Sequence, residues 1–204
     1  MSEKFPEGLS YLQAPNEEEM TEETRKVVDE TLEFQAMING FTPNMFRVLP
    51  LNSELFRRWW TFADGLFNPE ISYLSNPDKE MMGVVVSAEN KCPLCLTTHA
   101  FALRSFGLDA SWVELLTYNY RVCPMDERQR ALCDFAYDLT TRPNEIEKES
   151  VDKLRAVGLN DHEIMEAIFT ASYFNFSNRF SIAMGIVPDK EFAYGHRNPQ
   201  PAEE

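Results

Sequence analysis

The sequence predicts an all-α fold. Apolar residues recur every three or four positions along several segments, as in helices that bury one face. Helix stops and starts, such as Asn39-Gly40 and Gly107-Leu108-Asp109, divide the chain into helix-sized segments. The only β-branched run near the centre is VVVSAEN, and no repeated strand pattern surrounds it. We therefore expect a single helical domain over residues 1–204.

The composition is that of a globular protein that does not bind polyanions. Hydrophobic residues make up 44% of the 204 residues and charged residues 25%. A formal net charge of -14 argues against nucleic acid or an anionic membrane as partner. Four cysteines do not form a disulfide framework in a chain this long. Because we find neither a signal peptide nor an apolar run of ~20 residues, we expect a soluble, cytoplasmic protein.

The first part of the chain is acidic and then helical. Residues 1–24 carry seven Glu against one Lys and are expected to form an irregular lead-in over a core. A helix is expected from Thr21 to the stop at Asn39-Gly40. A further helix over residues 41–49 is broken by Pro50.

An aromatic-rich helix follows, which Asn52-Ser53 caps. Its apolar residues recur at spacings of three and four, so we interpret them as core or subunit interface. The alternative is that Trp59 or Trp60 lines a pocket beside reactive thiols. The residues concerned are Leu55, Phe56, Trp59, Trp60 and Phe62.

The stretch Lys79–Gly107 organises the rest of the chain, and we interpret it as two helices that meet at a pair of cysteines. Asn76-Pro77-Asp78 is a good helix entrance, and residues 81–88 are apolar at nearly every position. The second helix opens at Cys92-Pro93, because proline cannot continue the first helix but is favoured in a first turn.

That break favours thiol chemistry. Cys92 is expected near the cap of the new helix and Cys95 in its first turn, where unpaired N–H groups and the helix dipole stabilise a thiolate. Lys91 adds a positive charge. His99 follows one turn after Cys95 on the same face and can exchange a proton with its sulfur. Glu80 joins them only if the two helices pack side by side. The pattern predicts a dithiol redox site with a carboxylate–imidazole proton relay.

Three other interpretations of the cysteine pair are a zinc site, a thioredoxin-type motif and a pair of inert buried thiols. Cys92, Cys95 and His99 supply three zinc ligands, but a structural site needs four. The fourth would have to come from Cys123, Cys133 or an acid, and no second pair of closely spaced ligands supports this. A thioredoxin-type motif needs flanking strands, which the sequence lacks. Two inert buried thiols are the third possibility. We favour the redox site, without metal or cofactor, and expect the other two cysteines to be structural.

The second half of the chain predicts further helices. Residues 111–116 and 127–139 follow Gly107 and Pro124, and a helix over 144–157 is expected to end at Gly158. A long helix pair is expected over residues 163–186. Residues 189–204 resemble a polar tail.

A weak internal repeat links two of these segments. KEMMGVVVSAENKCPLC is echoed by HEIMEAIFTASYFNFSN, in which Asn175 and Asn178 take the places of Cys92 and Cys95. We therefore expect a second helix break near Asn175 and a pseudo-twofold bundle in which one copy kept the thiols. The two asparagines are expected to cap and to hydrogen-bond.

With Glu80 twelve positions before Cys92-x-x-Cys95, and His99 after them, the chain resembles the AhpD-like alkylhydroperoxidases. These belong to the carboxymuconolactone decarboxylase superfamily, and the peroxidase-related branch is the more similar one. Three further stretches extend the resemblance over about residues 40 to 188: Thr42–Phe46, Leu139–Pro143 and Tyr173–Arg179.

The resemblance implies an all-helical fold, a trimer or hexamer of identical chains, and reduction of a hydroperoxide. Cys95 would be the peroxidatic thiol and Cys92 the resolving thiol, whose disulfide an external dithiol reduces. Glu80 and His99 would activate Cys95. One departure is Leu94, which stands where the best-known members have a second histidine between the cysteines.

Two other functions remain open on the sequence alone. The same cysteines would serve a dithiol–disulfide oxidoreductase or a redox sensor without a main peroxidase role. The chain would otherwise be a non-catalytic helical assembly, or a zinc-binding module, whose cysteines only pack or hold metal.

Overall fold

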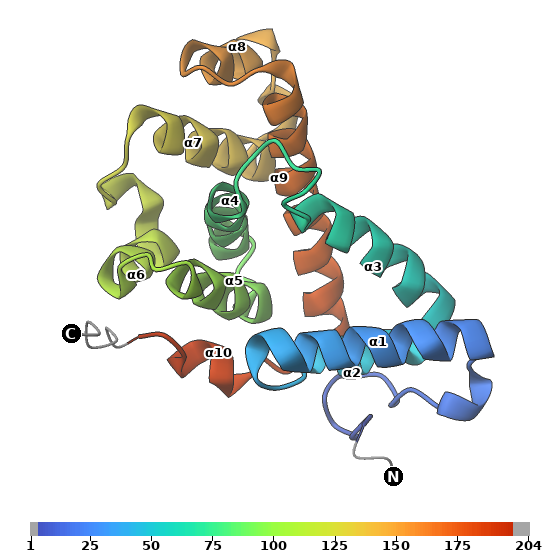
Figure 1. Ribbon diagram of the computed structural model, residues 1–204. Coiled ribbons are helices and arrows are strands. Elements are labelled where there is room, and N and C mark those ends of the chain that lie inside the picture. Colours follow the sequence, from blue (N-terminus) through green and yellow to red (C-terminus); the bar gives the residue numbers. More distant parts are fainter. Residues whose placement is uncertain (1–3, 198–204) are drawn as a thin grey trace. The chain divides into compact units, whose positions relative to one another are not determined.

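The computed structural model describes residues 4–197, which contain α-helices and short 3-10 turns but no strand (Figure 1). The predicted all-α fold is confirmed. None of the helices in this range is long and apolar enough to cross a bilayer. The described residues fall into two compact units. The first draws on Met1–Leu66 and Phe180–Asp189, and the second on Phe67–Arg179 and Lys190–Glu204.

The first unit contains α1 (Glu22–Asn39), α2 (Asn44–Val48) and α3 (Ser53–Phe67). Helix α1 begins where the sequence predicts, because the Thr21 side chain accepts a hydrogen bond from the Thr24 N–H, and it ends at Gly40 with φ of 76°. The expected lead-in contributes to the core of this unit. That core contains Phe5, Met20, Val28, Leu32 and Phe56, with Trp59 and Trp60 packed against it.

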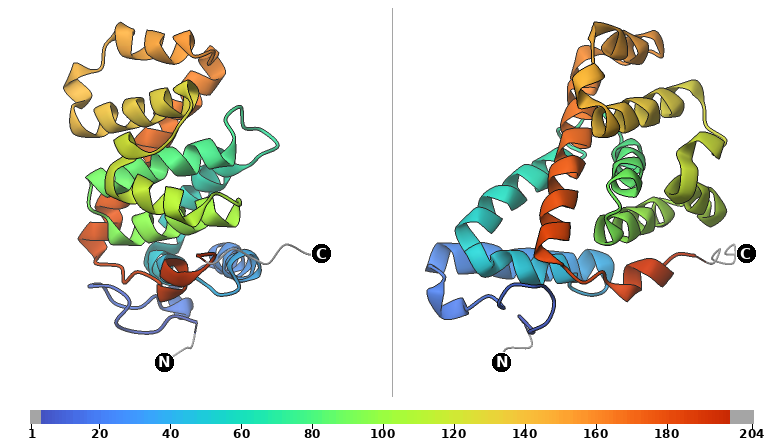
Figure 2. Two further views of the ribbon diagram at one scale, coloured as in Figure 1. Left: turned by 90° about the vertical axis from the view of Figure 1, so that its left-hand side faces the viewer. Right: turned by 180° about the vertical axis from the view of Figure 1, so that it is seen from behind.

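The second unit is arranged around α4 (Asn76–Glu89), whose residues 79–87 are all buried. Helix α4 packs against three helices of this unit (Figures 1 and 2), namely α5 (Pro93–Ser105), α6 (Ala110–Asn119) and α7 (Glu127–Thr141). The remaining helices are α8 (Lys148–Ala156), α9 (Asp161–Met184) and α10 (Lys190–Tyr194). Residues 81–86 of α4 are apolar on every face because the helix is surrounded by other helices.

The helix break expected near Asn175 is absent. Helix α9 runs without interruption from Asp161 to Met184, so the predicted helix pair over 163–186 is wrong. The physical reason lies in the sequence: α9 contains neither proline nor glycine, whereas Pro93 stops the first copy.

Two other boundaries differ from the prediction. Helix α8 begins at Lys148, not at residue 144, because a 3-10 turn over Pro143–Glu145 comes first. Residues 190–197 do not form a polar tail: α10 buries Phe192, which lies 5.0 Å from the Phe101 ring, and buried Arg104 donates to its carbonyl oxygen. Residues 198–204 lie outside the described part of the chain.

Candidate active site

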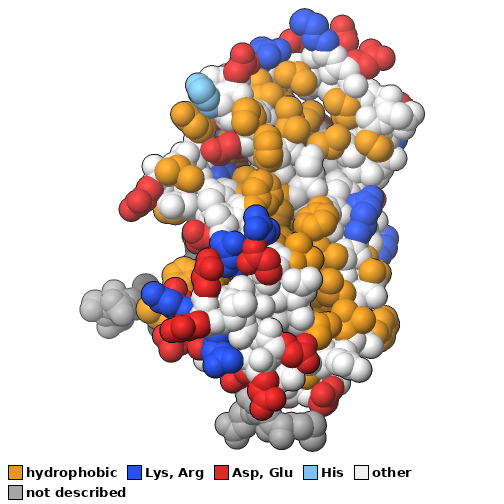
Figure 3. Space-filling view, turned by 90° about the vertical axis from the view of Figure 1, so that its right-hand side faces the viewer, with side chains coloured by type: hydrophobic (Ala, Val, Ile, Leu, Met, Phe, Trp, Pro, Cys, Tyr) orange, Lys and Arg blue, Asp and Glu red, His pale blue; other side chains and the backbone are white. Residues whose placement is uncertain are grey.

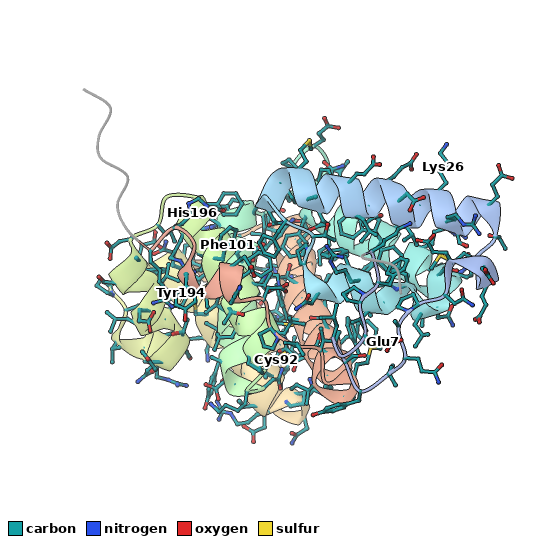
Figure 4. All side chains as sticks on the ribbon, turned by 90° about the horizontal axis from the view of Figure 1, so that it is seen from below. Glu7, Lys26, Cys92, Phe101, Tyr194 and His196 are labelled. Atoms are coloured by element: carbon teal, nitrogen blue, oxygen red, sulfur yellow. The ribbon has the colours of Figure 1, made fainter. Side chains whose placement is uncertain are left out.

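The turn between α4 and α5 places the first cysteine. Helix α4 ends in a Schellman motif, in which the Cys92 N–H donates to the Ser87 carbonyl (3.0 Å) and the Lys91 N–H to the Ala88 carbonyl (3.3 Å). Lys91 adopts a left-handed conformation, with φ of 56°. Cys92 is then the N-cap residue of α5, and Pro93 begins the helix. Figure 4 labels Cys92 in this turn. The predicted break at Cys92-Pro93 is confirmed.

Both thiols of the pair are buried. The exposed fraction is 1% for Cys92 and 3% for Cys95, and all four cysteines are free thiols. The pKa of the Cys92 thiol is lowered to about 7, first because the Cys95 side chain hydrogen-bonds to its sulfur. Burial opposes this shift, while the backbone of Cys95 and Leu94 and the charge of His99 favour the thiolate.

The consequence is that the Cys92 thiol is partly ionised near neutral pH. The sequence indicated that the start of α5 favours a thiolate. The lowered pKa belongs to the capping thiol, Cys92, where the Cys95 side chain is the first cause and the backbone of Cys95 and Leu94 adds to it.

A carboxylate–imidazole pair lies on the same two helices. His99 Nδ1 is 2.5 Å from Glu80 Oε2. Glu80 projects from α4 and His99 from α5, and these helices pack side by side, as the relay requires. Because Nδ1 faces Glu80, Nε2 is the nitrogen that can exchange a proton with a sulfur or a substrate. The His99 side chain is 20% exposed, which connects the relay to solvent.

An aromatic ring fixes the other side of His99. The Phe174 ring meets the imidazole edge to face, with centroids 4.5 Å apart. Phe174 comes close because Gly83 has no side chain: a Cβ atom at Gly83 would lie 2.2 Å from the ring. Sequence analysis did not connect these residues to the site. The one available signal was a lone glycine within an apolar helix, which often marks close packing.

Amide side chains join the end of α4 to α9. Asn90 Nδ2 donates to Asn175 Oδ1 and to Asn178 Oδ1, both at 3.0 Å. Asn178 Nδ2 in turn donates to Ser87 Oγ at 3.0 Å. The expectation that Asn175 and Asn178 hydrogen-bond is confirmed, although they lie inside a helix and cap nothing.

The other cysteines lie in surroundings that disfavour ionisation. Burial raises the pKa of the Cys133 thiol well above its usual range and also raises that of Cys123. Leu94, which stands between the paired cysteines, is buried. Within residues 4–197 there is no group of three or more His, Cys, Asp or Glu residues placed to hold a metal ion.

Known structures of the same fold exist. An uncharacterised peroxidase-related protein from Silicibacter sp. TM1040 is 32% identical with a TM-score of 0.84, and the match covers 97% of this chain and 100% of that one. The alkylhydroperoxidase AhpD core protein of Ralstonia eutropha JMP134, also peroxidase-related and uncharacterised, is 26% identical with a TM-score of 0.85, and covers 96% and 100%.

A more distant structure is the debrominase Bmp8. It is 16% identical with a TM-score of 0.67, covers 88% of this chain and 93% of its own, and shows a common fold only. No protein-family model matches the sequence, and no curated protein matches it. The close structural matches nevertheless define the class: the chain belongs to the AhpD-like, peroxidase-related proteins of the carboxymuconolactone decarboxylase superfamily.

Proposed function

We propose that the protein is a thiol-dependent hydroperoxide reductase. The observation that carries the proposal is the juxtaposition of a Cys-x-x-Cys pair at a helix start with a Glu80–His99 pair, which lies 2.5 Å apart on the same two helices. The proton relay is suited to activate Cys95 for attack on a peroxide bond, and the lowered pKa of Cys92 suits that thiol to resolve the product. Membership of a peroxidase-related family agrees with it.

In the first step Cys95 attacks the hydroperoxide. His99 Nε2 accepts the proton of the Cys95 thiol, and Glu80 stabilises the imidazolium that forms. The sulfur then attacks the terminal oxygen, an S–O bond forms, and the O–O bond breaks. The departing alkoxide takes the proton from His99 and leaves as an alcohol. Cys95 is thereby oxidised to a sulfenic acid.

In the second step Cys92 resolves the sulfenic acid. Its lowered pKa makes it a ready thiolate at neutral pH, and it attacks the Cys95 sulfur. A disulfide forms, and hydroxide leaves as water after protonation. The sum is two thiols and one hydroperoxide converted to a disulfide, an alcohol and water. An external dithiol returns the enzyme to its reduced form by thiol–disulfide exchange.

The test is oxidation of the pre-reduced protein by cumene hydroperoxide, with counting of free thiols. We expect the wild type to lose two thiols per chain, and Cys92→Ser to accumulate sulfenic acid on Cys95, trapped by dimedone and located by mass spectrometry. Oxidation no faster than that of free dithiothreitol would exclude the peroxidase. Sulfenic acid on Cys92 in Cys95→Ser would reverse the two roles.

A second candidate is a dithiol oxidoreductase or redox sensor. It is favoured by the lowered pKa of Cys92, the cap residue, because such a thiolate also leaves readily in thiol–disulfide exchange. The fold shared with a debrominase agrees with a function other than peroxide reduction on this scaffold. Rapid disulfide formation with oxidised glutathione but slow reaction with cumene hydroperoxide would favour this candidate.

We also propose that the chain forms a homo-oligomer. Exposed apolar side chains are visible as orange surface in Figure 3, and in the second unit several lie on one face of α9. These are Met165, Ile168, Phe169 and Phe176. Sedimentation velocity is expected to give a trimer or hexamer, and Met165→Glu to weaken it. A monomer at micromolar concentration would contradict the proposal.

A further inference from the structure

The residue before the first cysteine has an unusual backbone conformation. Lys91 has φ of 56°, although a side chain with a Cβ atom rarely adopts this region. Lys91 occupies the C′ position of the Schellman motif, which is normally taken by glycine or asparagine. A lysine at this place needs neighbouring contacts that keep the turn from relaxing.

Hydrogen bonds of amide side chains between the end of α4 and α9 provide those contacts. Ser87 is bound twice: its carbonyl oxygen accepts from the Cys92 N–H, and its hydroxyl oxygen accepts from Asn178 Nδ2, both at 3.0 Å. Asn90, the last residue before the turn, donates to Asn178 Oδ1 at 3.0 Å. Ser87 and Asn178 are both fully buried, so water does not compete for these hydrogen bonds.

We propose that Asn178, together with Asn90, is a positioning residue for the thiol pair. By fastening the last turn of α4 to α9, these amides keep Lys91 left-handed and Cys92 at the cap of α5. Neither amide is needed to touch the substrate. The proposal deepens the peroxidase function and rests on it only for its biological meaning, since thiol placement is measurable without any hydroperoxide.

The alternative state explains why positioning matters. If Lys91 returns to an ordinary negative φ, the Schellman hydrogen bond to Ser87 breaks and the chain direction after it changes. Cys92 then leaves the start of α5 and loses both the Cys95 hydrogen bond and the backbone N–H groups that favour its thiolate. The sulfur would behave as an ordinary thiol.

The experiment measures the pH dependence of alkylation by iodoacetamide, resolved for each cysteine by mass spectrometry. In the wild type the midpoint is expected near the Cys92 pKa of about 7. In Asn178→Ala it is expected to move toward about 8.5, the ordinary thiol value, so that alkylation at pH 7 slows by about tenfold. An unchanged midpoint in a folded but less heat-stable variant would overturn the proposal.

A rescue variant separates positioning from general stability. Glycine adopts the left-handed region readily, so Lys91→Gly added to Asn178→Ala is expected to restore most of the midpoint shift. A structural role alone predicts no such rescue. The matched control is Tyr120→Phe, which removes a hydrogen bond to Asp134 in the same unit and is expected to lower the melting temperature only. An equal midpoint shift in that control would also overturn the proposal.

A milder variant covers the case in which Asn178→Ala does not fold. Ser87→Ala removes only the hydroxyl acceptor and leaves the helix intact. It is expected to move the midpoint in the same direction by a smaller amount, and no movement would count against the proposal. If the midpoint shifts as expected but hydroperoxide oxidation is slow in every variant, the positioning role stands and the peroxidase function fails.

Discussion

The two copies of the weak internal repeat have similar sequences, but the first is interrupted and the second is one continuous helix. In the first copy the chain breaks at Cys92-Pro93, and the pKa of the Cys92 thiol is lowered at the new helix start, first by the Cys95 side chain. In the second copy α9 continues through Asn175 and Asn178, so no helix start exists there. The comparison indicates that Pro93 gives the first copy a helix start at its cysteine pair, which the second copy lacks together with the cysteines.

The largest expected effect is the removal of the thiol in the interrupted copy. Cys95→Ser deletes the sulfur that we propose attacks the hydroperoxide, so the rate of hydroperoxide-driven oxidation is expected to fall on the order of 10³-fold or more. Stopped-flow tryptophan fluorescence after mixing with cumene hydroperoxide measures this rate. Cys133→Ser is the matched control, because its buried thiol has a raised pKa and is expected to leave the rate unchanged. Retained activity in Cys95→Ser would exclude the assignment.

A proline at the equivalent place in α9 tests whether that copy tolerates a break. Phe176 corresponds to Pro93 in the repeat and is 58% exposed, so its replacement opens no buried cavity. Phe176→Pro removes a backbone hydrogen bond inside the helix and is expected to lower the free energy of unfolding by about 3 kcal/mol. Urea titration measures it, with Phe176→Ala as control. Equal stability of the two variants would show that α9 has no need to be continuous.

Sequence alone predicted the parts of the site that lie close together in the chain. The cap position of Cys92 follows from the adjacent proline, and the spacing of Cys95 and His99 follows from one helical turn. The predicted break near Asn175 was wrong because similarity to the first copy was given more weight than the lack of a proline or glycine. Contacts such as Phe174 with His99, or Asn178 with Ser87, join distant segments, and a lone glycine such as Gly83 marks close packing without identifying the partner.

The proton relay is expected to contribute less than the thiol itself. Glu80→Gln keeps the shape of the side chain but removes the negative charge beside His99 Nδ1, so the imidazolium loses its partner. The oxidation rate at neutral pH is expected to fall by about 10²-fold, the usual contribution of a general acid–base group. A pH–rate profile measures it, and Glu163→Gln, the equivalent acid of the second copy, is the control. Equal effects of the two substitutions would argue against a relay.

Substitution of Gly83 tests how closely Phe174 of the second copy packs against the first copy. A Cβ atom there would lie 2.2 Å from the Phe174 ring, which itself contacts His99. Gly83→Ala is expected to lower the free energy of unfolding by about 1–3 kcal/mol through overpacking. The control is Gly65→Ala in α3, where a Cβ atom meets nothing within 4 Å. It is expected to stabilise by up to about 1 kcal/mol, since alanine is the better helix former. Chemical denaturation of both variants measures the contrast, and equal values would contradict it.

The smallest effect is a pH dependence of stability that belongs to the interrupted copy alone. The folded-state pKa of Cys92 is about 7, below that of an unfolded thiol, so folding favours the thiolate. This stabilisation is therefore fully present above the unfolded pKa of about 8.5 and is lost as the pH falls through 7. The reduced wild type is expected to gain stability between pH 6.5 and 9 relative to Cys92→Ser, measured by urea unfolding under reducing conditions. Asn175 takes the place of Cys92 in the second copy and does not titrate, so that position adds no such pH dependence. Parallel pH profiles for wild type and Cys92→Ser would mean that the helix start does not stabilise a thiolate at this position.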